Sequence, residues 1–255
     1  MKRRKFSNKV KLLLKINVVL FSILAIIVAL NTSVYLDRKN VHEENFVNIR
    51  ITKTYSPTDT SDPETLLDNI EIYEGTASGL AIKTIDSETY IITAAHFCVA
   101  FSSGPKDLES DTRITITDTD SKMHEGDIIF ISEEPDLCLI ESSSLKKVET
   151  IQFSVMPAVG DKVYAISSPL EISQDGVLLH FEGFFSGCDE NNICFYTIPA
   201  TNGSSGSVVF NQRGRAIGMI QMVPSRFNSV SMGSGYHLID SFLKEASLYL
   251  NIDLY

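Results

Sequence analysis

The segment from Thr201 to Phe210, TNGSSGSVVF, contains the residue types that can present a nucleophile. Small residues surround Ser205, so its hydroxyl is uncrowded and the chain can turn sharply there. Glycine at 203 and 206 permits backbone angles that a residue with a Cβ resists, so amide N–H groups near Ser205 can converge on one point. Such donors could hold an oxyanion. The alternative is a Gly/Ser turn before a strand, which is a common feature of β proteins.

A serine nucleophile needs a base, and the base needs a carboxylate to orient it. Two upstream segments supply these types: YIITAAHFC, which contains His96 after small residues, and EPDLCLIE, which has Asp136 at the start of an apolar run. Alone, the histidine is explained by a structural role and the aspartate by the entry to a strand. The order His, Asp, Ser across three such segments favours a catalytic triad.

The three segments resemble motifs of the trypsin-like serine peptidases of the chymotrypsin fold. TAAH, ending at His96, is similar to the family's histidine motif, DLCLI from Asp136 to its aspartate motif, and GSSGS around Ser205 to its G-N-S-G-G motif. GTASGLAI (75–82) and GRAIGMI (214–220) resemble the strands that precede the histidine and follow the serine. The likeness is closer to HtrA-type and other short bacterial members than to digestive trypsin.

This resemblance covers residues 74–243. It implies that a polypeptide substrate is hydrolysed by Ser205 as nucleophile, His96 as base and Asp136 as its orienting carboxylate. The backbone N–H groups of Gly203 and Ser205 are expected to form the oxyanion hole. No metal or organic cofactor is implied.

Some positions depart from the family's pattern. Ser207 and Val208 stand where a second glycine and a proline are commoner, which predicts a stiffer turn after the nucleophile. Ser204 replaces the aspartate with which digestive trypsins capture a freed N-terminus, and no Arg/Lys-Ile-Val-Gly-Gly site precedes Gly75, so zymogen cleavage is not expected. The G-x-S-x-G elbow of α/β-hydrolases also fails, because Ser207 occupies the place of its last glycine.

By the same resemblance, Pro199 is the floor of the specificity pocket and the strand from Met219 to Met222 is its wall. Proline has no carboxylate to pair with lysine or arginine. Ile220 and Gln221 stand where glutamyl-specific relatives place a histidine. A pocket of Pro199, Ile220, Gln221 and Met222 is therefore predicted to prefer a small or medium aliphatic residue, and only weakly, because apolar pockets discriminate poorly.

The elements that must position these residues are short strands. From residue 70 onward, short apolar stretches alternate with turn signals, which is typical of an all-β fold. With the resemblance, the prediction is two six-stranded antiparallel β-barrels, chymotrypsin-like, with a C-terminal helix. The expected strands are 46–55, 76–84, 90–94, 113–117, 127–132 and 137–141, then 162–167, 176–185, 193–198, 207–210, 216–221 and 233–238. Ile239, Phe242, Leu243, Ala246 and Leu250 recur at helical spacing and predict the helix.

The composition predicts one globular domain of ordinary hydrophobicity. The 255 residues are 44% hydrophobic and 21% charged, enough for this domain and an anchor but too few for added PDZ modules. Seven of the 22 basic residues lie within residues 1–15, which leaves 15 basic against 32 acidic residues in the rest of the chain. A nucleic-acid partner is therefore not expected, because phosphate contacts need a basic surface.

The four cysteines lack the C-x-x-C spacing of a zinc site, and no metal is expected. Cys188 and Cys194 flank DENNI and could close a hairpin with a disulfide in an oxidising compartment, although two unpaired thiols are equally compatible with the sequence. Cys138 lies between Leu137 and Leu139 and is expected to act as a small buried apolar residue.

The N-terminal region has the pattern of a membrane anchor. Residues 16–30 are almost wholly apolar, and extension to 36 reaches the length that spans a bilayer core. We predict a basic cytoplasmic tail (1–15), a transmembrane signal anchor (16–36), a linker containing a first strand (37–69) and the peptidase domain (70–255) on the periplasmic or extracellular side. A cleavable signal peptide is disfavoured because no A-x-A-like site follows, and a core helix because of the basic flank.

Two other functions are compatible with the chain. One is a catalytically inactive trypsin-like module that binds a partner at the membrane, and the other is a membrane-tethered structural or assembly protein. The three residue types within their motifs favour the enzyme, because a binding module has no chemical need for all of them.

Overall fold

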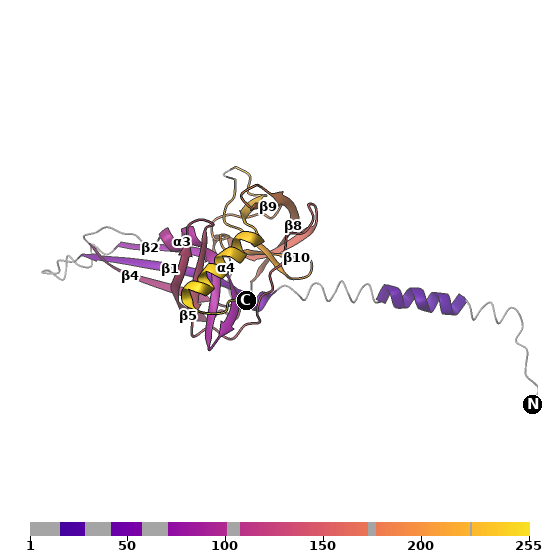
Figure 1. Ribbon diagram of the computed structural model, residues 1–255, viewed down its shortest axis with the longest axis horizontal. Coiled ribbons are helices and arrows are strands. Elements are labelled where there is room, and N and C mark those ends of the chain that lie inside the picture. The colour runs from indigo at the N-terminus through magenta and orange to yellow at the C-terminus, as the bar shows by residue number, and fades with distance from the viewer. Residues whose placement is uncertain (1–15, 29–41, 58–70, 101–107, 173–176, 225) are drawn as a thin grey trace, which may run out of the picture. The chain divides into compact units, whose positions relative to one another are not determined.

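The computed structural model of the protein describes residues 16–28, 42–57, 71–100, 108–172, 177–224 and 226–255, in two units, Met1–Val41 and His42–Tyr255 (Figure 1). In the first unit, residues 16–28 form a helix whose residues are all exposed, and residues 29–36 of the predicted anchor lie outside the described residues. Among the helices of the described residues, none has both the length and the apolar character needed to cross a membrane.

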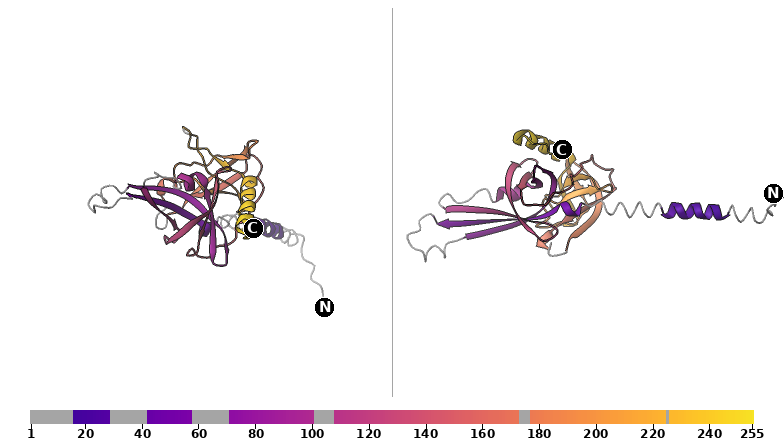
Figure 2. Two further views of the ribbon diagram at one scale, coloured as in Figure 1. Left: turned by 60° about the vertical axis from the view of Figure 1, so that its left-hand side comes forward. Right: turned by 90° about the horizontal axis from the view of Figure 1, so that it is seen from below.

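The first half of the second unit is a closed antiparallel barrel with strand order β1-β2-β3-β6-β5-β4. Beyond the barrel, β1, β2 and β4 continue as a paired extension (Figure 2). The strand predicted at 46–55 is β1, so the folded unit begins at His42 rather than at residue 70. The strands are β1 (Phe46–Pro57), β2 (Glu71–Ile85), β3 (Glu88–Ala94), β4 (Leu108–Thr117), β5 (Met123–Ser132) and β6 (Leu137–Ser142).

Strands β3 and β6 are buried on both of their faces. Ile91 of β3 and Ile140 of β6 point into the first barrel, while Ile92 and Leu139 belong to the core between the two sheets. Successive side chains of a strand alternate between its faces. An alternating apolar and polar pattern is therefore absent from the two strands that lead into the site.

The second half is a curled six-stranded sheet, not the closed barrel that we predicted, with order β11-β10-β7-β8-β9-β12. Its edge strands are only four residues long, and the isolated pair Gly218 and Gly235 links their ends in place of a ladder. The strands are β7 (Lys162–Ser167), β8 (Leu179–Cys188), β9 (Ile193–Tyr196), β10 (Val208–Asn211), β11 (Ala216–Met219) and β12 (Ser231–Ser234).

Helix α4 (Tyr236–Leu250) follows β12 and packs on the core between the sheets (Figures 1 and 2). Ile239, Phe242, Leu243 and Ala246 are buried, which confirms the predicted C-terminal helix. It begins within the strand predicted at 233–238. The sequence did not predict three shorter elements: α3 (Ala95–Ala100) and the 3-10 turns η2 (Glu43–Asn45) and η3 (Pro169–Glu171).

A buried carboxylate closes the turn between β4 and β5. One oxygen of Asp118 accepts the N–H groups of Asp120 (2.9 Å) and Lys122 (3.0 Å), and the other lies 3.0 Å from His124 Nε2. The Asp118 side chain is 2% exposed. Burial raises the pKa of this carboxyl, but the N–H of Lys122, the ring of His124 and the N–H of Asp120 together hold that pKa below its ordinary value.

Asp118→Ala is expected to lower the free energy of unfolding at pH 7 by about 1–3 kcal/mol, because the N–H groups of Asp120 and Lys122 lose the charged acceptor that closes the turn. A lowered folded-state pKa contributes stability above the unfolded pKa of about 3.9, and this contribution is lost as the pH falls through the folded pKa. In urea denaturation, the difference in the free energy of unfolding between wild type and Asp118→Ala should therefore be smaller at pH 3 than at pH 7. Asp120→Ala, at an exposed carboxylate, is the control. A difference in the free energy of unfolding that is as large at pH 3 as at pH 7 would contradict this account.

Candidate active site

The pairing of β3 with β6 brings His96 and Asp136 together. The two strands are antiparallel with Ala94 opposite Leu137, so the residues just beyond β3 meet those just before β6. Ala95 N–H donates to the Asp136 carbonyl (3.1 Å). The Asp136 carboxylate accepts the backbone N–H of His96 (2.7 Å), and its second oxygen lies 2.8 Å from His96 Nδ1. The Asp136 carboxylate thereby orients His96 through both its backbone N–H and its imidazole ring.

Ser205 reaches this pair from the turn that links β9 to β10. Its Oγ lies 3.1 Å from His96 Nε2 and 3.3 Å from the Gln221 carbonyl. The His96 side chain is 49% exposed and Ser205 is half-buried, so neither residue is enclosed in the core. The three residues predicted as a triad are thus joined by two contacts, and a hydroxyl in this arrangement can lose its proton to the imidazole as it attacks a carbon.

The turn around Ser205 is pressed against strand β2. Ser78 N–H donates to the Ser205 carbonyl (2.9 Å), and the Ser78 carbonyl accepts the Thr93 hydroxyl (2.8 Å). Gly206 has φ 89°, and a Cβ there would collide with the Ser78 carbonyl and with Thr93 Oγ1. Only glycine both adopts this positive φ without strain and leaves room for the Ser78 carbonyl and the Thr93 hydroxyl.

Two backbone donors of the same turn are unused within the described residues. The N–H groups of Gly203 and Ser205 have no acceptor there, whereas those of Ser204 and Gly206 donate to the carbonyls of Thr201 (2.9 Å) and Ile220 (2.8 Å). The two residues predicted for the oxyanion hole therefore carry N–H groups available to a ligand.

The residues predicted for the specificity pocket have different environments. Pro199 and Met222 are exposed, while Ile220 is 1% exposed within the core of the second sheet. Gln221 is 4% exposed, so neither Ile220 nor Gln221 offers its side chain to a substrate. The side chains of Ile220 and Gln221 therefore do not form the wall of the specificity pocket that was predicted from them.

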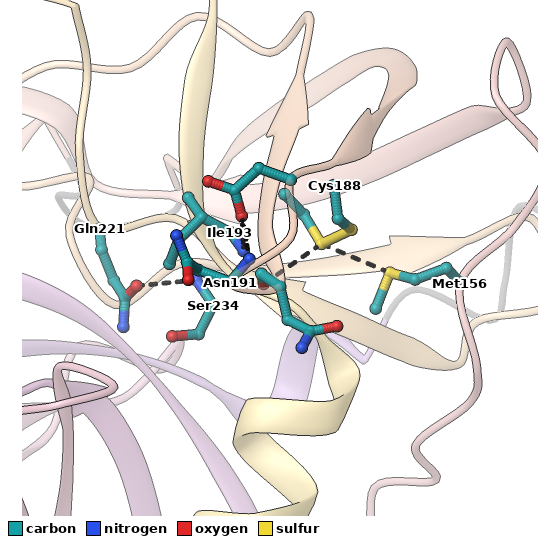
Figure 3. Close-up of a disulfide and its surroundings, with 9 residues drawn as sticks. Met156, Cys188, Asn191, Ile193, Gln221 and Ser234 are labelled. Atoms are coloured by element: carbon teal, nitrogen blue, oxygen red, sulfur yellow. Dashed lines mark hydrogen bonds between the residues drawn. A yellow bond between two sulfur atoms is a disulfide. The ribbon is translucent and has the colours of Figure 1, made fainter.

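Gln221 instead connects the second sheet to the turn that carries Asp136. Its Nε2 donates to the carbonyls of Pro135 (3.1 Å) and Asp136 (2.5 Å), and its Oε1 accepts the N–H of Ser234 (2.7 Å; Figure 3). The Ser234 hydroxyl also donates to the Pro135 carbonyl (2.7 Å). The sequence does contain a signal for this role, since Gln221 is the polar residue of the apolar run GMIQMV.

Two disulfides lie in the second unit. Cys98 of α3 is bonded to Cys138 of β6, two residues after His96 and two after Asp136, respectively. Cys138 is fully buried as predicted, but its sulfur is bonded and not a free thiol. Cys188 is bonded to Cys194 across the hairpin between β8 and β9, beside Met156 (Figure 3). Among the described residues, no group of three or more His, Cys, Asp or Glu could hold a metal ion.

The two disulfides should differ in their reactivity toward a reductant. Cys98, Cys138 and Cys194 are 0% exposed, but Cys188 is exposed. Thiol–disulfide exchange requires access to a sulfur. Mild dithiothreitol treatment of the folded protein is therefore expected to reduce Cys188–Cys194 first, as measured by alkylation and peptide mass spectrometry. Both should reduce together in urea, and earlier alkylation of Cys98 would contradict this order.

Comparison with known proteins agrees with this architecture. A sequence model described as the trypsin-like peptidase domain matches residues 77–219. Among solved structures, the chain is similar to the serine endoprotease from Yersinia pestis, with a TM-score of 0.58 and 15% identity over 84% of this chain. The matched part is 66% of that protein's chain, and at this identity the likeness concerns the fold. No curated protein sequence matches the chain.

Proposed function

The chain belongs to the trypsin-like peptidase domain family, and from this we propose that it is a serine endopeptidase that hydrolyses peptide bonds through an acyl-enzyme. The observation that carries the proposal is the pair of contacts from Asp136 to His96 (2.8 Å) and from His96 to Ser205 (3.1 Å). Each contact joins the ring nitrogen and the oxygen that the reaction requires.

In the first half of the reaction, Ser205 Oγ forms a bond to the scissile carbonyl carbon while its proton passes to His96 Nε2. Asp136 accepts the Nδ1–H and stabilises the imidazolium. The N–H groups of Gly203 and Ser205 bind the oxyanion. Collapse of the tetrahedral intermediate breaks the C–N bond, and the leaving amine takes the proton from His96 Nε2.

In the second half, water attacks the acyl-enzyme. His96 Nε2 takes the water proton, and a second tetrahedral intermediate forms at the same two N–H groups. As the ester bond breaks, His96 Nε2 returns the proton to Ser205 Oγ and the carboxyl product leaves. His96 carries each proton between Ser205, the leaving amine and the attacking water, so the proposal needs no metal or organic cofactor.

The test is covalent labelling of the purified protein with a fluorophosphonate. We expect one phosphonyl group per chain, located on the peptide that contains Ser205. Heat-denatured protein should not react, since labelling requires the activated hydroxyl. A folded protein that remains unlabelled would favour the inactive binding module instead.

For the substrate side chain before the scissile bond, we propose a small or medium aliphatic residue. Of the four residues predicted for the pocket, Pro199 and Met222 have exposed side chains, and neither carries a charge. A lysine, arginine or glutamate side chain would gain no ion pair from them. Cleavage-site profiling on a denatured proteome tests this specificity, and a dominant basic or acidic residue at that position would contradict it.

We also propose that residues 16–36 anchor the protein in a membrane with the peptidase domain on the periplasmic or extracellular side. The apolar run at 16–30 and the seven positive charges in residues 1–15 support this orientation. Alkaline carbonate should leave the full-length chain in the membrane pellet. Externally added protease should digest the domain once any outer barrier is permeabilised, and release of the intact chain by carbonate would contradict the anchor.

A further inference from the structure

The direction of the Gly203 N–H is set by a contact on the other side of its peptide group. The Asn202 carbonyl accepts the N–H of Leu170 (2.8 Å). In a planar trans peptide the C=O and the N–H point in opposite directions. A donor that holds the Asn202 carbonyl from one side therefore aims the Gly203 N–H to the opposite side.

The segment that supplies this donor lies directly against the turn. A Cβ at Gly203, where φ is 88°, would lie 2.5 Å from the Ser168 carbonyl oxygen and 3.1 Å from Leu170 N. Only glycine allows the two pieces of backbone to come this close. The close approach leaves the Asn202–Gly203 peptide little freedom to rotate while residues 168–172 stay in place.

One buried hydroxyl joins this segment, the turn and the first barrel. Ser78 Oγ on β2 accepts the N–H of Ser168 (3.0 Å) and donates to the Gly203 carbonyl (2.9 Å). Ser78 is 0% exposed. Because its backbone N–H also donates to the Ser205 carbonyl (2.9 Å), Ser78 contacts both residues whose N–H groups have no acceptor among the described residues.

The segment itself adopts a conformation that needs support from outside. Leu170 and Glu171 have φ values of 52° and 59°, a region that residues with side chains occupy only at an energetic cost. Three side chains of the first barrel hold the segment. Asn48 Nδ2 donates to Ser168 Oγ (2.8 Å), and the Glu171 carboxylate binds Arg50 (2.9 Å) and Thr76 (3.3 Å).

We propose that the Ser78 hydroxyl and the Leu170 N–H are positioning groups that hold the oxyanion hole in its active orientation, an inference that rests on the proposed peptidase function. Neither group touches the substrate. Ser78 fixes the Gly203 carbonyl, and Leu170 fixes the Asn202 carbonyl. The peptide groups before and after Gly203 are therefore held in place by the first barrel and by the segment bound to it. Losing either group lets the Gly203 N–H turn away from the oxyanion.

Ser78→Ala tests the first group, with Ser167→Ala as its matched control. Ser167 is 1% exposed and adjacent to Ser168, but its hydroxyl has no partner among the described residues. Loss of a complete oxyanion donor lowers kcat by about 10²–10³-fold, so misaligning one donor should lower it by about 10–100-fold. KM should stay within about twofold, and affinity for a peptide boronate, which forms a tetrahedral adduct, should fall with kcat. Ser167→Ala should match wild type in all three measurements.

Replacing Leu170 by its α-hydroxy acid analogue tests the second group and does not disturb the core. The change substitutes an ester oxygen for the N–H, and the Leu170 side chain is 63% exposed, so packing is preserved. We expect about a 10-fold lower kcat in a protein that stays folded, because the change removes a single hydrogen bond, so this variant decides the question if Ser78→Ala does not fold. Wild-type kcat in the ester variant and in folded Ser78→Ala would overturn the inference while the peptidase assignment stands. If fluorophosphonate does not label the wild-type protein, the proposed peptidase function is contradicted, and this inference is contradicted with it.

Discussion

Ser205→Ala is expected to abolish peptide hydrolysis and to leave the fold intact. Without Oγ neither the attack nor the acyl-enzyme can occur, and losing the nucleophile or its base lowers kcat by about 10⁶-fold in a serine peptidase of unrelated fold. His96→Ala should have a similar effect, because the hydroxyl then loses the base that lies 3.1 Å away. The measurement is the rate of hydrolysis of a casein-type substrate, with circular dichroism to verify folding.

Ser207→Ala is the matched control for this experiment. It removes a hydroxyl two residues further along the same turn, where the side chain is 0% exposed and has no hydrogen-bond partner among the described residues. Deleting an unsatisfied buried hydroxyl removes no hydrogen bond. Activity should therefore stay within about twofold of wild type. Casein hydrolysis by purified Ser205→Ala at the wild-type rate would end the assignment of Ser205 as the nucleophile.

Gly206→Ala is expected to cause the largest loss of stability among single-methyl additions to this turn. The new Cβ would combine a left-handed φ of 89° with a collision against the Ser78 carbonyl. Together these effects should lower the free energy of unfolding by about 2–5 kcal/mol. Fluorophosphonate labelling should fall as well, since the collision moves the turn away from His96. Urea denaturation followed by labelling of the folded fraction measures both effects.

Gly160→Ala separates the two contributions. Gly160 has nearly the same φ, 91°, but no atom lies within 4 Å of a Cβ built there. The substitution should therefore lower the free energy of unfolding by only about 1–2 kcal/mol, the backbone term alone, and leave labelling unchanged. Equal losses at positions 160 and 206 would show that the contact with Ser78 has no energetic weight.

The parts of the site that the sequence predicts are those with a local signal. His96, Asp136 and Ser205 stand at the ends of apolar strands or between glycines. Each of these patterns can be recognised from a stretch of about ten residues of sequence. Contacts between distant segments have no such signal. Ser78 lies on β2, and Ser168 follows β7 90 residues further along the chain, so their hydrogen bond follows only from the folded arrangement.

The strand predictions succeeded where turns bracket apolar runs and failed at the edges of the second sheet. Strand β12 covers residues 231–234 and overlaps the strand expected at 233–238 only at residues 233 and 234, because α4 already begins at Tyr236. Periodicity does not reveal whether a curled sheet closes, since closure depends on the length and register of its edge strands. The Cys98–Cys138 bridge does have a signal in the sequence, because each cysteine follows a predicted triad residue by two positions.

The Cys98–Cys138 bridge also acts on the unfolded chain. It spans 40 residues, and in the chain-entropy description a crosslink of this span lowers the conformational entropy of the denatured ensemble by an amount equivalent to about 4 kcal/mol at 25 °C. A domain is typically stable by only about 5–15 kcal/mol, so this single bond supplies a substantial share. A newly synthesised chain that folds before its thiols are oxidised would lack that share, and the yield of stable protein would then follow the rate of oxidation in its compartment.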